Sequence, residues 1–368
     1  MTYLEPIRGM GGYVATGFQM IRSIDVTNFR CFERLSVHNV SRLNVITGDN
    51  GSGKTALLES IFMPLAVGSE IAIRMRQQRG LDTVFSGPAR RIEETLWGDL
   101  FHGFDMKKRI SLSVTGDGEE SRMLEISKGR AGVTLPMDVD GVNSPVISAP
   151  VNFTWTNAQG ESYVVTPEIR QNGLQFPDTG EDMPEFFFIP AMQIIGTSEN
   201  AGRFSDLSKV NRQGKIVRTF ISEFKQIEDL SIEVSSGSPA IFASIRNANM
   251  KVPLPSLSSG INRLLCIILA IASRPKSIVL VDEIENGLHH KHFSFLWKAI
   301  IDLLKENDSQ LFAVTHSAEC LNALGAQLKR NKIDIGLWQT DHRDGQFVVD
   351  VTIGNPVELA LEYGDEVR

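Results

Sequence analysis

Gly48-Asp49-Asn50-Gly51-Ser52-Gly53-Lys54-Thr55 matches the pattern G-x-x-x-x-G-K-[ST] at every fixed position. In a loop of this kind the glycines let backbone N–H groups turn inward around phosphate oxygens. Lys54 then reaches the β- and γ-phosphates, and the Thr55 hydroxyl ligates Mg²⁺. An apolar run at 43–46 predicts a buried strand before the loop, and helical spacing at 55–62 predicts a helix after it. The sequence therefore predicts an ATP-binding loop that comprises Gly48, Asn50, Gly51, Ser52, Gly53, Lys54 and Thr55.

Length and composition are those of a globular protein of one large domain or two, with 368 residues, 42% hydrophobic and 22% charged. No apolar run approaches the roughly 20 residues that span a bilayer, and the N-terminus lacks the apolar core of a signal peptide. We expect a cytoplasmic protein without a membrane partner. The net charge of −7 provides no global field for nucleic acid. Nucleic acid stays possible because small basic clusters occur, such as Lys107-Lys108-Arg109.

The order of patterns along the chain predicts one ATPase domain over residues 20–368, after a leader at 1–19 that shows no periodicity and is excluded from the fold. Two strands are expected near 24–29 and 32–37. Short alternating runs separated by turn signals predict an antiparallel β insertion at 107–176. The fold class that follows is α/β, with a mixed central sheet flanked by helices.

The second half of the chain alternates apolar strands with helices. Strands are expected at 186–189, 278–281 and 311–316, with two shorter ones near 335 and 347–351. Helices are expected at 203–225, 264–272, 288–304 and the C-terminus. All-apolar runs are typical of central parallel strands. The polar turn Ser258-Ser259-Gly260 precedes one of these helices, and a helix N-terminus is a natural place for an anion.

Two of the apolar strands end in polar residues suited to phosphoryl chemistry. Asp282 is placed to hold Mg²⁺ opposite Thr55, and Glu283 to polarise a water that attacks the γ-phosphate. If Glu283 is not the base, Glu285 is the next carboxylate. His316 ends the following strand and is expected to contact the γ-phosphate or the positioned water. The predicted catalytic residues are Glu283, His316 and Lys54, and the predicted metal ligands are Thr55 and Asp282.

Four motifs of this chain are the phosphate loop, Leu257-Ser-Ser-Gly260, Val281-Asp-Glu-Ile-Glu-Asn-Gly-Leu-His289 and Thr315-His-Ser317. Together they resemble the ATPase domain of the OLD (overcoming lysogenization defect) family. This family belongs to the ABC-type ATPases, as do RecF and the SMC proteins. Asn28-Phe-Arg-Cys-Phe32 also resembles the opening of RecF, SMC and OLD heads, so the resemblance extends over nearly all of 20–368.

The resemblance implies a P-loop NTPase of the ABC, RecF and SMC-head type, with ATP and Mg²⁺ as its ligands. It implies composite sites between two copies of the chain, in which Ser258, Ser259 and Gly260 of one copy cap the γ-phosphate held by the other. Glu285, Asn286 and Gly287 would form the D-loop at that interface. The signature departs from Leu-Ser-Gly-Gly-Gln, and Gln193 is the candidate for the Q-loop glutamine.

The resemblance also suggests a biological setting. OLD nucleases carry a C-terminal Toprim domain, and only about fifty residues follow His316, which is too few for such a domain. The leading hypothesis is an OLD-like ATPase that senses or scaffolds for a separate effector such as a Toprim-type nuclease, as in the PARIS anti-phage system. The alternative is a RecF-like DNA-repair ATPase. A transporter subunit is disfavoured because about 200 residues separate Lys54 from the signature.

Overall fold

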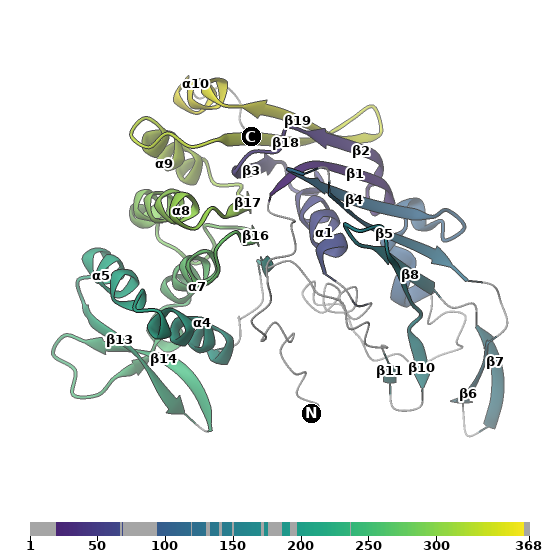
Figure 1. Ribbon diagram of the computed structural model, residues 1–368, viewed down its shortest axis with the longest axis horizontal. Coiled ribbons are helices and arrows are strands. Elements are labelled where there is room, and N and C mark those ends of the chain that lie inside the picture. Colours follow the sequence, from purple (N-terminus) through teal and green to yellow (C-terminus); the bar gives the residue numbers. More distant parts are fainter. Residues whose placement is uncertain are drawn as a thin grey trace.

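Two six-stranded sheets form the framework of the computed structural model (Figure 1). Three predicted features lie outside the described residues: the leader at 1–19, one of the turn signals of the expected insertion, at 140–141, and Gln193. The structure describes residues 20–66, 68, 94–118, 120–129, 133–139, 142–148, 151–170, 173–175, 186–191, 197–235 and 237–363.

The central sheet holds the strands that the apolar runs predicted. Its first five strands are parallel to their neighbours, and the sixth pairs antiparallel with the fifth. The carboxyl ends of the parallel strands share one edge, so the polar residues that follow them come together there. The order is β12 (Phe186–Ile189), β16 (Ile278–Val281), β17 (Gln310–Val314), β3 (Leu43–Gly48), β18 (Ile335–Arg343) and β19 (Gln346–Ile353).

The second sheet is antiparallel and joins the first strands of the chain to strands from the expected insertion. That stretch is antiparallel as predicted, but four of its strands extend the sheet begun by the N-terminal pair. The order is β2 (Phe32–His38), β1 (Ile21–Phe29), β4 (Ile110–Gly116), β5 (Ser121–Lys128), β8 (Val151–Thr156) and β9 (Ser162–Val165). Two hairpins accompany it: β6 (Val133–Val139) with β7 (Val142–Ser148), and β10 (Glu168–Arg170) with β11 (Gly173–Gln175).

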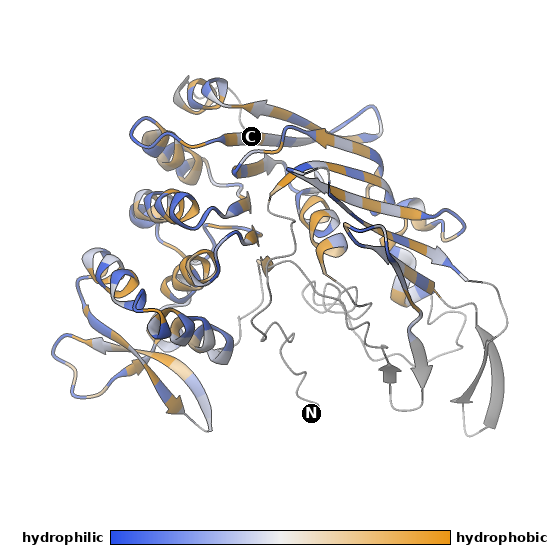
Figure 2. Cartoon of the chain, in the orientation of Figure 1, coloured by the Kyte–Doolittle hydropathy of each residue, from blue (hydrophilic) through white to orange (hydrophobic). Residues whose placement is uncertain are grey.

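Alternation along the central strands divides the core between the two faces of the central sheet. Ile278 and Leu280 of β16 pack into a cluster with α1 (Lys54–Leu65) and the antiparallel sheet. Val279 and Val281 pack into the other cluster, with the helices on the opposite face. The helix after the phosphate loop therefore lies between the sheets, and Figure 2 shows that most of its residues are hydrophobic.

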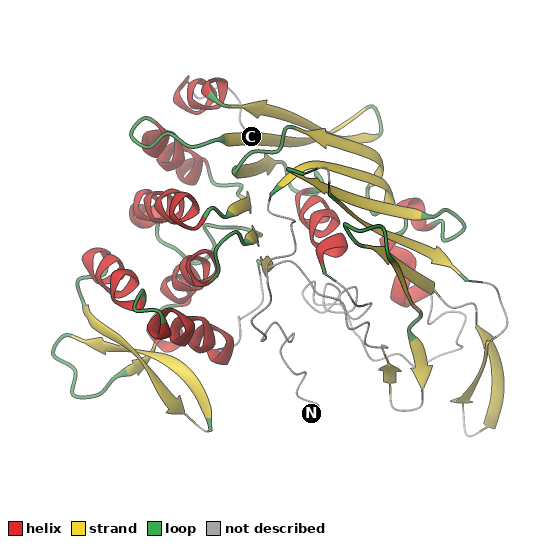
Figure 3. Ribbon diagram, in the orientation of Figure 1, coloured by secondary structure: helices red, strands yellow, loops and turns green. Residues whose placement is uncertain are grey.

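Helices α7 (Ser259–Ser273), α8 (Phe293–Asn307) and α9 (Ala318–Leu328) stack along the face of the central sheet opposite α1 (Figure 3). The helix expected from residue 288 begins instead at Phe293, because a 3₁₀ turn, η3 (His290–His292), precedes it. Within the described ranges, none of the helices combines the length and apolar character needed to cross a membrane.

A smaller layer lies beyond α7 in Figure 1 and contains α4 (Thr197–Lys209) and α5 (Gln213–Glu223). One or two helices were predicted there, but the hairpin of β13 (Ile227–Ser235) and β14 (Ser238–Ile245) was not. The remaining elements are short: η1 (Gly98–Leu100), η2 (His102–Phe104), β15 (Val252–Pro253), α6 (Leu254–Leu257) and the C-terminal α10 (Asn355–Tyr363).

Candidate nucleotide site

The loop between β3 and α1 has the backbone of a phosphate-binding loop. Gly48, Gly51 and Gly53 have φ values of 138°, 82° and 95°, a region that residues with a Cβ rarely adopt. No side chain caps the N-terminus of α1, so its first N–H groups are left for another acceptor. The loop is therefore built to receive an anion at a helix N-terminus.

Lys54 lies over this loop. Its Nζ donates to the carbonyl oxygens of Gly48 and Asp49, each at 2.7 Å. Burial lowers the pKa of the Lys54 ammonium, and the nearby carboxylates of Asp282, Asp49 and Glu283 oppose that shift. The ammonium is thus held among the residues that would surround phosphate oxygens.

Asp282 directly follows β16 and contacts the first turn of α1. The Thr55 hydroxyl donates to its Oδ2 at 3.0 Å, and the side chain is almost wholly buried. Burial raises the pKa of Asp282, whereas the hydrogen bond from Thr55 works in the opposite direction. A hydroxyl and a carboxylate at this separation supply the oxygen ligands that Mg²⁺ prefers.

Glu283 follows in the left-handed region, with φ of 49°, and its side chain is partly exposed. Its Oε2 lies 3.4 Å from the amide nitrogen of Asn286. The guanidinium of Arg263, on α7, donates to the backbone oxygens of Asp282 and of Glu283, the latter at 3.1 Å, and to that of Pro190 at 2.8 Å. Arg263 therefore fixes the backbone that carries both carboxylates.

His316 follows β17, directly before α9. Its backbone N–H donates to Oε1 of Glu285 at 3.1 Å, and its Nδ1 lies 3.4 Å from the same oxygen. The His316 side chain is 53% exposed, whereas that of Glu285 is only 9% exposed. The three strand ends β3, β16 and β17 thus bring Lys54, Asp282 and His316 to one edge of the central sheet.

The signature residues open α7. Ser258 is its N-cap and accepts from the N–H of Ile261 at 3.3 Å, and Ser259 is exposed. Gly260 packs against the backbone of Gly287, so closely that an added Cβ would lie 1.9 Å from the Gly287 oxygen. The signature and the predicted D-loop of one chain are therefore in direct contact.

The three predicted D-loop residues differ in exposure. Asn286 and Gly287 are exposed, as a surface that meets a neighbouring chain requires, but the Glu285 carboxylate is directed inward at His316 of its own chain. Glu285 therefore belongs structurally to the surroundings of His316.

Thr340 of β18 is a site residue that sequence reasoning missed. Its hydroxyl donates to the Thr47 oxygen at 3.0 Å and lies 2.5 Å from the hydroxyl oxygen of Ser52. Its backbone oxygen is so close to Gly48 that an added Cβ would lie 2.2 Å away. No motif surrounds Thr340, and only the pairing of β18 with β3 brings it to the loop.

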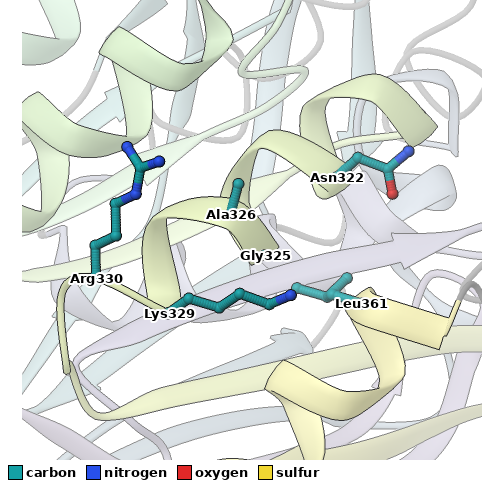
Figure 4. Close-up of a pocket in the computed structure, with 6 residues that line it drawn as sticks. All are labelled: Asn322, Gly325, Ala326, Lys329, Arg330 and Leu361. Carbon is teal, nitrogen blue, oxygen red and sulfur yellow. The ribbon is translucent and has the colours of Figure 1, made fainter.

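A hollow of about 300 Å³ lies apart from these residues, between α9 and α10 (Figure 4). Two basic residues, Lys329 and Arg330, line it together with apolar and amide side chains. Its lining consists of Asn322, Gly325, Ala326, Lys329, Arg330 and Leu361, none of which belongs to the loop or to the strand ends described above.

Comparison with solved structures supports the fold. The SMC head bound to the C-terminal winged-helix domain of ScpA is similar, with a TM-score of 0.50 and 16% identity, over 91% of this chain and 98% of that one. An SMC head with an extended coiled coil, bound to the C-terminal domain of ScpA derived from Pyrococcus furiosus, also has a TM-score of 0.50. It is 14% identical over 95% of this chain and 99% of its own. The fold is therefore that of a P-loop NTPase head.

Comparison of sequences gives a family and two relatives. An ATP/GTP phosphatase of Helicobacter pylori is 23% identical over 83% of this chain and 87% of its own. The DNA replication and repair protein RecF of Idiomarina loihiensis is 44% identical over 43 residues, 12% of each chain. A family model described as "AAA domain, putative AbiEii toxin, Type IV TA system" matches residues 169–322. A second, described as "AAA domain", matches residues 23–233, which is more than half of the chain. The chain thus belongs to the AAA-domain family, whose members are ATPases.

Proposed function

We propose that this chain hydrolyses ATP with Mg²⁺ at the edge of the central sheet where β3, β16 and β17 end. The observation that carries the proposal is the junction of α1 with β16, where the Thr55 hydroxyl meets the Asp282 carboxylate directly beside Lys54. A phosphate loop, a pair of oxygen ligands and a second carboxylate within one edge are the parts that phosphoryl transfer needs.

Each residue has a separate role in this proposal. The loop N–H groups and Lys54 hold the phosphates, and Thr55 and Asp282 hold the cation. When bound, Mg²⁺ neutralises the charge of the β- and γ-phosphate oxygens. Glu283 accepts a proton from the attacking water, and its partly exposed side chain leaves the carboxylate within reach of water. His316 contacts the γ-phosphate or that water.

The test is hydrolysis by Glu283→Gln. The amide keeps the shape of the side chain but is no base, so we expect ATP binding to persist and kcat to fall at least 100-fold. Glu228→Gln is the control, because Glu228 is an exposed carboxylate on β13 whose loss removes the same charge. Equal rates for Glu283→Gln and the parent at saturating ATP would refute this role for Glu283.

We also propose that two heads pair, with Ser258, Ser259 and Gly260 of one chain capping the nucleotide of the other. Two observations support this proposal. Ser259 and Asn286 are both exposed, and the segments that carry them are in contact where Gly260 packs against Gly287. A mixture of Lys54→Ala chains with Ser259→Arg chains, each inactive alone, should regain activity by forming one intact site per pair, because Ser259 is exposed and its replacement leaves the packing of Gly260 on Gly287 in place. Verified mixed pairs without any recovery would contradict catalysis in trans.

For the biological role, we propose an OLD-like ATPase that controls a separate effector in anti-phage defence. The family description that includes a putative toxin of a toxin–antitoxin system supports such a setting. The chain itself should leave plasmid DNA and transfer RNA intact in the presence of ATP with Mg²⁺ or Mn²⁺. Cleavage that persists through repurification, and that a carboxylate substitution outside the ATP site abolishes, would overturn this view.

The short RecF match supports the second candidate, a DNA-repair ATPase. The two roles differ in their ligand. ATP-dependent binding of labelled duplex DNA at physiological salt would favour the RecF-like role, and binding that disappears between 50 and 200 mM salt regardless of ATP would indicate unspecific phosphate contacts.

A further inference from the structure

Glu285 is a buried carboxylate that the proposed hydrolysis does not use. Its Oε1 accepts from the backbone N–H of His316 at 3.1 Å and also lies 3.4 Å from the Nδ1 of the same residue. Its Oε2 is buried, and no hydrogen-bond partner for it exists among the described residues. Burying a carboxylate is costly, so a chain that keeps one here gains something from the charge or the geometry.

The surrounding backbone holds Glu285 and His316 in fixed relation. The N–H of Ile284 donates to the Val314 oxygen at 2.9 Å, which ties the segment after β16 to the end of β17. Ser317 caps α9 and accepts from the N–H of Cys320 at 3.1 Å, which fixes the chain on the other side of His316. The imidazole therefore has little freedom except rotation about its own bonds.

The position of Nδ1 determines what the rest of the ring can do. A carboxylate oxygen 3.4 Å from Nδ1 favours a proton on that nitrogen, because Nδ1–H then faces the negative charge of Oε1. In the neutral ring this leaves the lone pair on Nε2, on the side of the ring away from Glu285. Since half of the His316 side chain is exposed, Nε2 is the atom available to a nucleotide or to its attacking water.

We propose that Glu285 is a positioning residue for His316: it holds Nδ1–H and the backbone of His316, and so presents Nε2 toward the phosphates. The proposal rests on the ATPase function above and deepens it. The proposal also gives different roles to two carboxylates that follow β16. Glu283 is partly exposed and suits a base, whereas Glu285 acts through the histidine.

The first test needs no hydrolysis. Nitrogen-15 spectra of the nucleotide-free chain with labelled histidine, recorded above neutral pH, report which ring nitrogen carries the proton. We expect His316, identified through His316→Gln, to be protonated at Nδ1 in the parent and in Glu285→Gln, which keeps an acceptor oxygen. Glu285→Ala should shift the proton to Nε2. A parent His316 protonated at Nε2 would overturn the proposal whether or not the chain hydrolyses ATP.

The second test is a double-mutant cycle on ATP hydrolysis. Loss of the outer partner of a metal-bound histidine reduces activity about 10- to 100-fold. By analogy, we expect Glu285→Ala to lower kcat by a similar factor and to leave the KM for ATP unchanged. In a His316→Ala background, Glu285→Ala should cause no further loss, and Glu228→Gln should have no effect in either background. Equal losses from Glu285→Ala with and without His316 would show a merely structural role. Failure of the Glu283→Gln test alone would refute the hydrolysis proposal and leave the spectroscopic result standing.

Discussion

A single methyl group at Gly260 should break the contact between the signature helix and the segment after β16. The added Cβ would lie 1.9 Å from the oxygen of Gly287, 2.4 Å from its carbonyl carbon and 2.9 Å from the Leu288 nitrogen. An ordinary C···O contact is about 3.3 Å, so one backbone must move by about 1.4 Å. All three of these atoms belong to the backbone, which cannot turn aside as the end of a flexible side chain can.

Overpacking of this kind costs about 1–3 kcal/mol, and here the cost opposes the gain of up to about 1 kcal/mol that Gly→Ala gives in a helix. Gly260→Ala should therefore unfold at lower urea concentration than the parent. Gly202→Ala on α4 is the matched control, because an added Cβ there meets nothing within 4 Å. It should raise the midpoint or leave it unchanged.

The assay is urea unfolding followed by circular dichroism, with ATP hydrolysis measured in parallel. At a slope of about 3 kcal/mol per molar urea, a net loss of about 1 kcal/mol, which is the middle of the overpacking range less the helix gain, lowers the midpoint by about 0.3 M. Hydrolysis should fall as well, because the signature and the D-loop can no longer meet. Equal midpoints and rates for Gly260→Ala and Gly202→Ala would refute the reasoning.

Two further substitutions test the surroundings of the loop. Burial raises the pKa of Asp282, so the folded chain disfavours its charged form and stability without nucleotide falls as pH rises above the ordinary carboxyl pKa. Asp282→Asn should therefore melt at a higher temperature than the parent at neutral pH, and this difference should disappear in acid. The same variant should bind ATP less tightly in the presence of Mg²⁺. A melting temperature below that of the parent at neutral pH would contradict the stability prediction. Thr340→Val removes the hydroxyl that contacts Ser52 and Thr47 and should cost about 1–3 kcal/mol of stability, with weaker binding of a fluorescent ATP analogue. Thr352→Val on the neighbouring strand is the control, and identical behaviour of the two valine variants would argue against support of the loop by β18.

The residues predicted from sequence are those whose position follows from local patterns. Lys54, Asp282 and His316 each follow an apolar run, and parallel strands end at one edge, so their convergence could be expected without knowing the strand order. The start of α8 was wrong by five residues, because three successive polar residues, His290–His292, form a 3₁₀ turn where helical spacing had been read.

What could not be predicted depends on contacts between distant segments. The contact of Thr340 with Ser52 requires the register of β18 against β3, nearly 300 residues apart. The hydrogen bonds from Arg263 to the backbone oxygens of Pro190 and Glu283 could be predicted only by knowing the direction of one side chain on a largely apolar helix. The inward direction of Glu285 was missed because a motif fixes the order of residues and not which of them is buried.

The contacts of α7 have a consequence for how ATP hydrolysis at the two sites of a pair would be coupled. Gly260 touches Gly287 and Arg263 holds the backbone of Glu283, so the N-terminal turns of α7 are fastened to the chain's own hydrolytic segment. If that end of α7 also grips a neighbour's γ-phosphate, ATP arriving at one site displaces the carboxylate of the other. The two sites of a pair would then hydrolyse ATP cooperatively, so that the rate depends on ATP concentration in a sigmoidal way. Arg263→Ala should make this dependence hyperbolic.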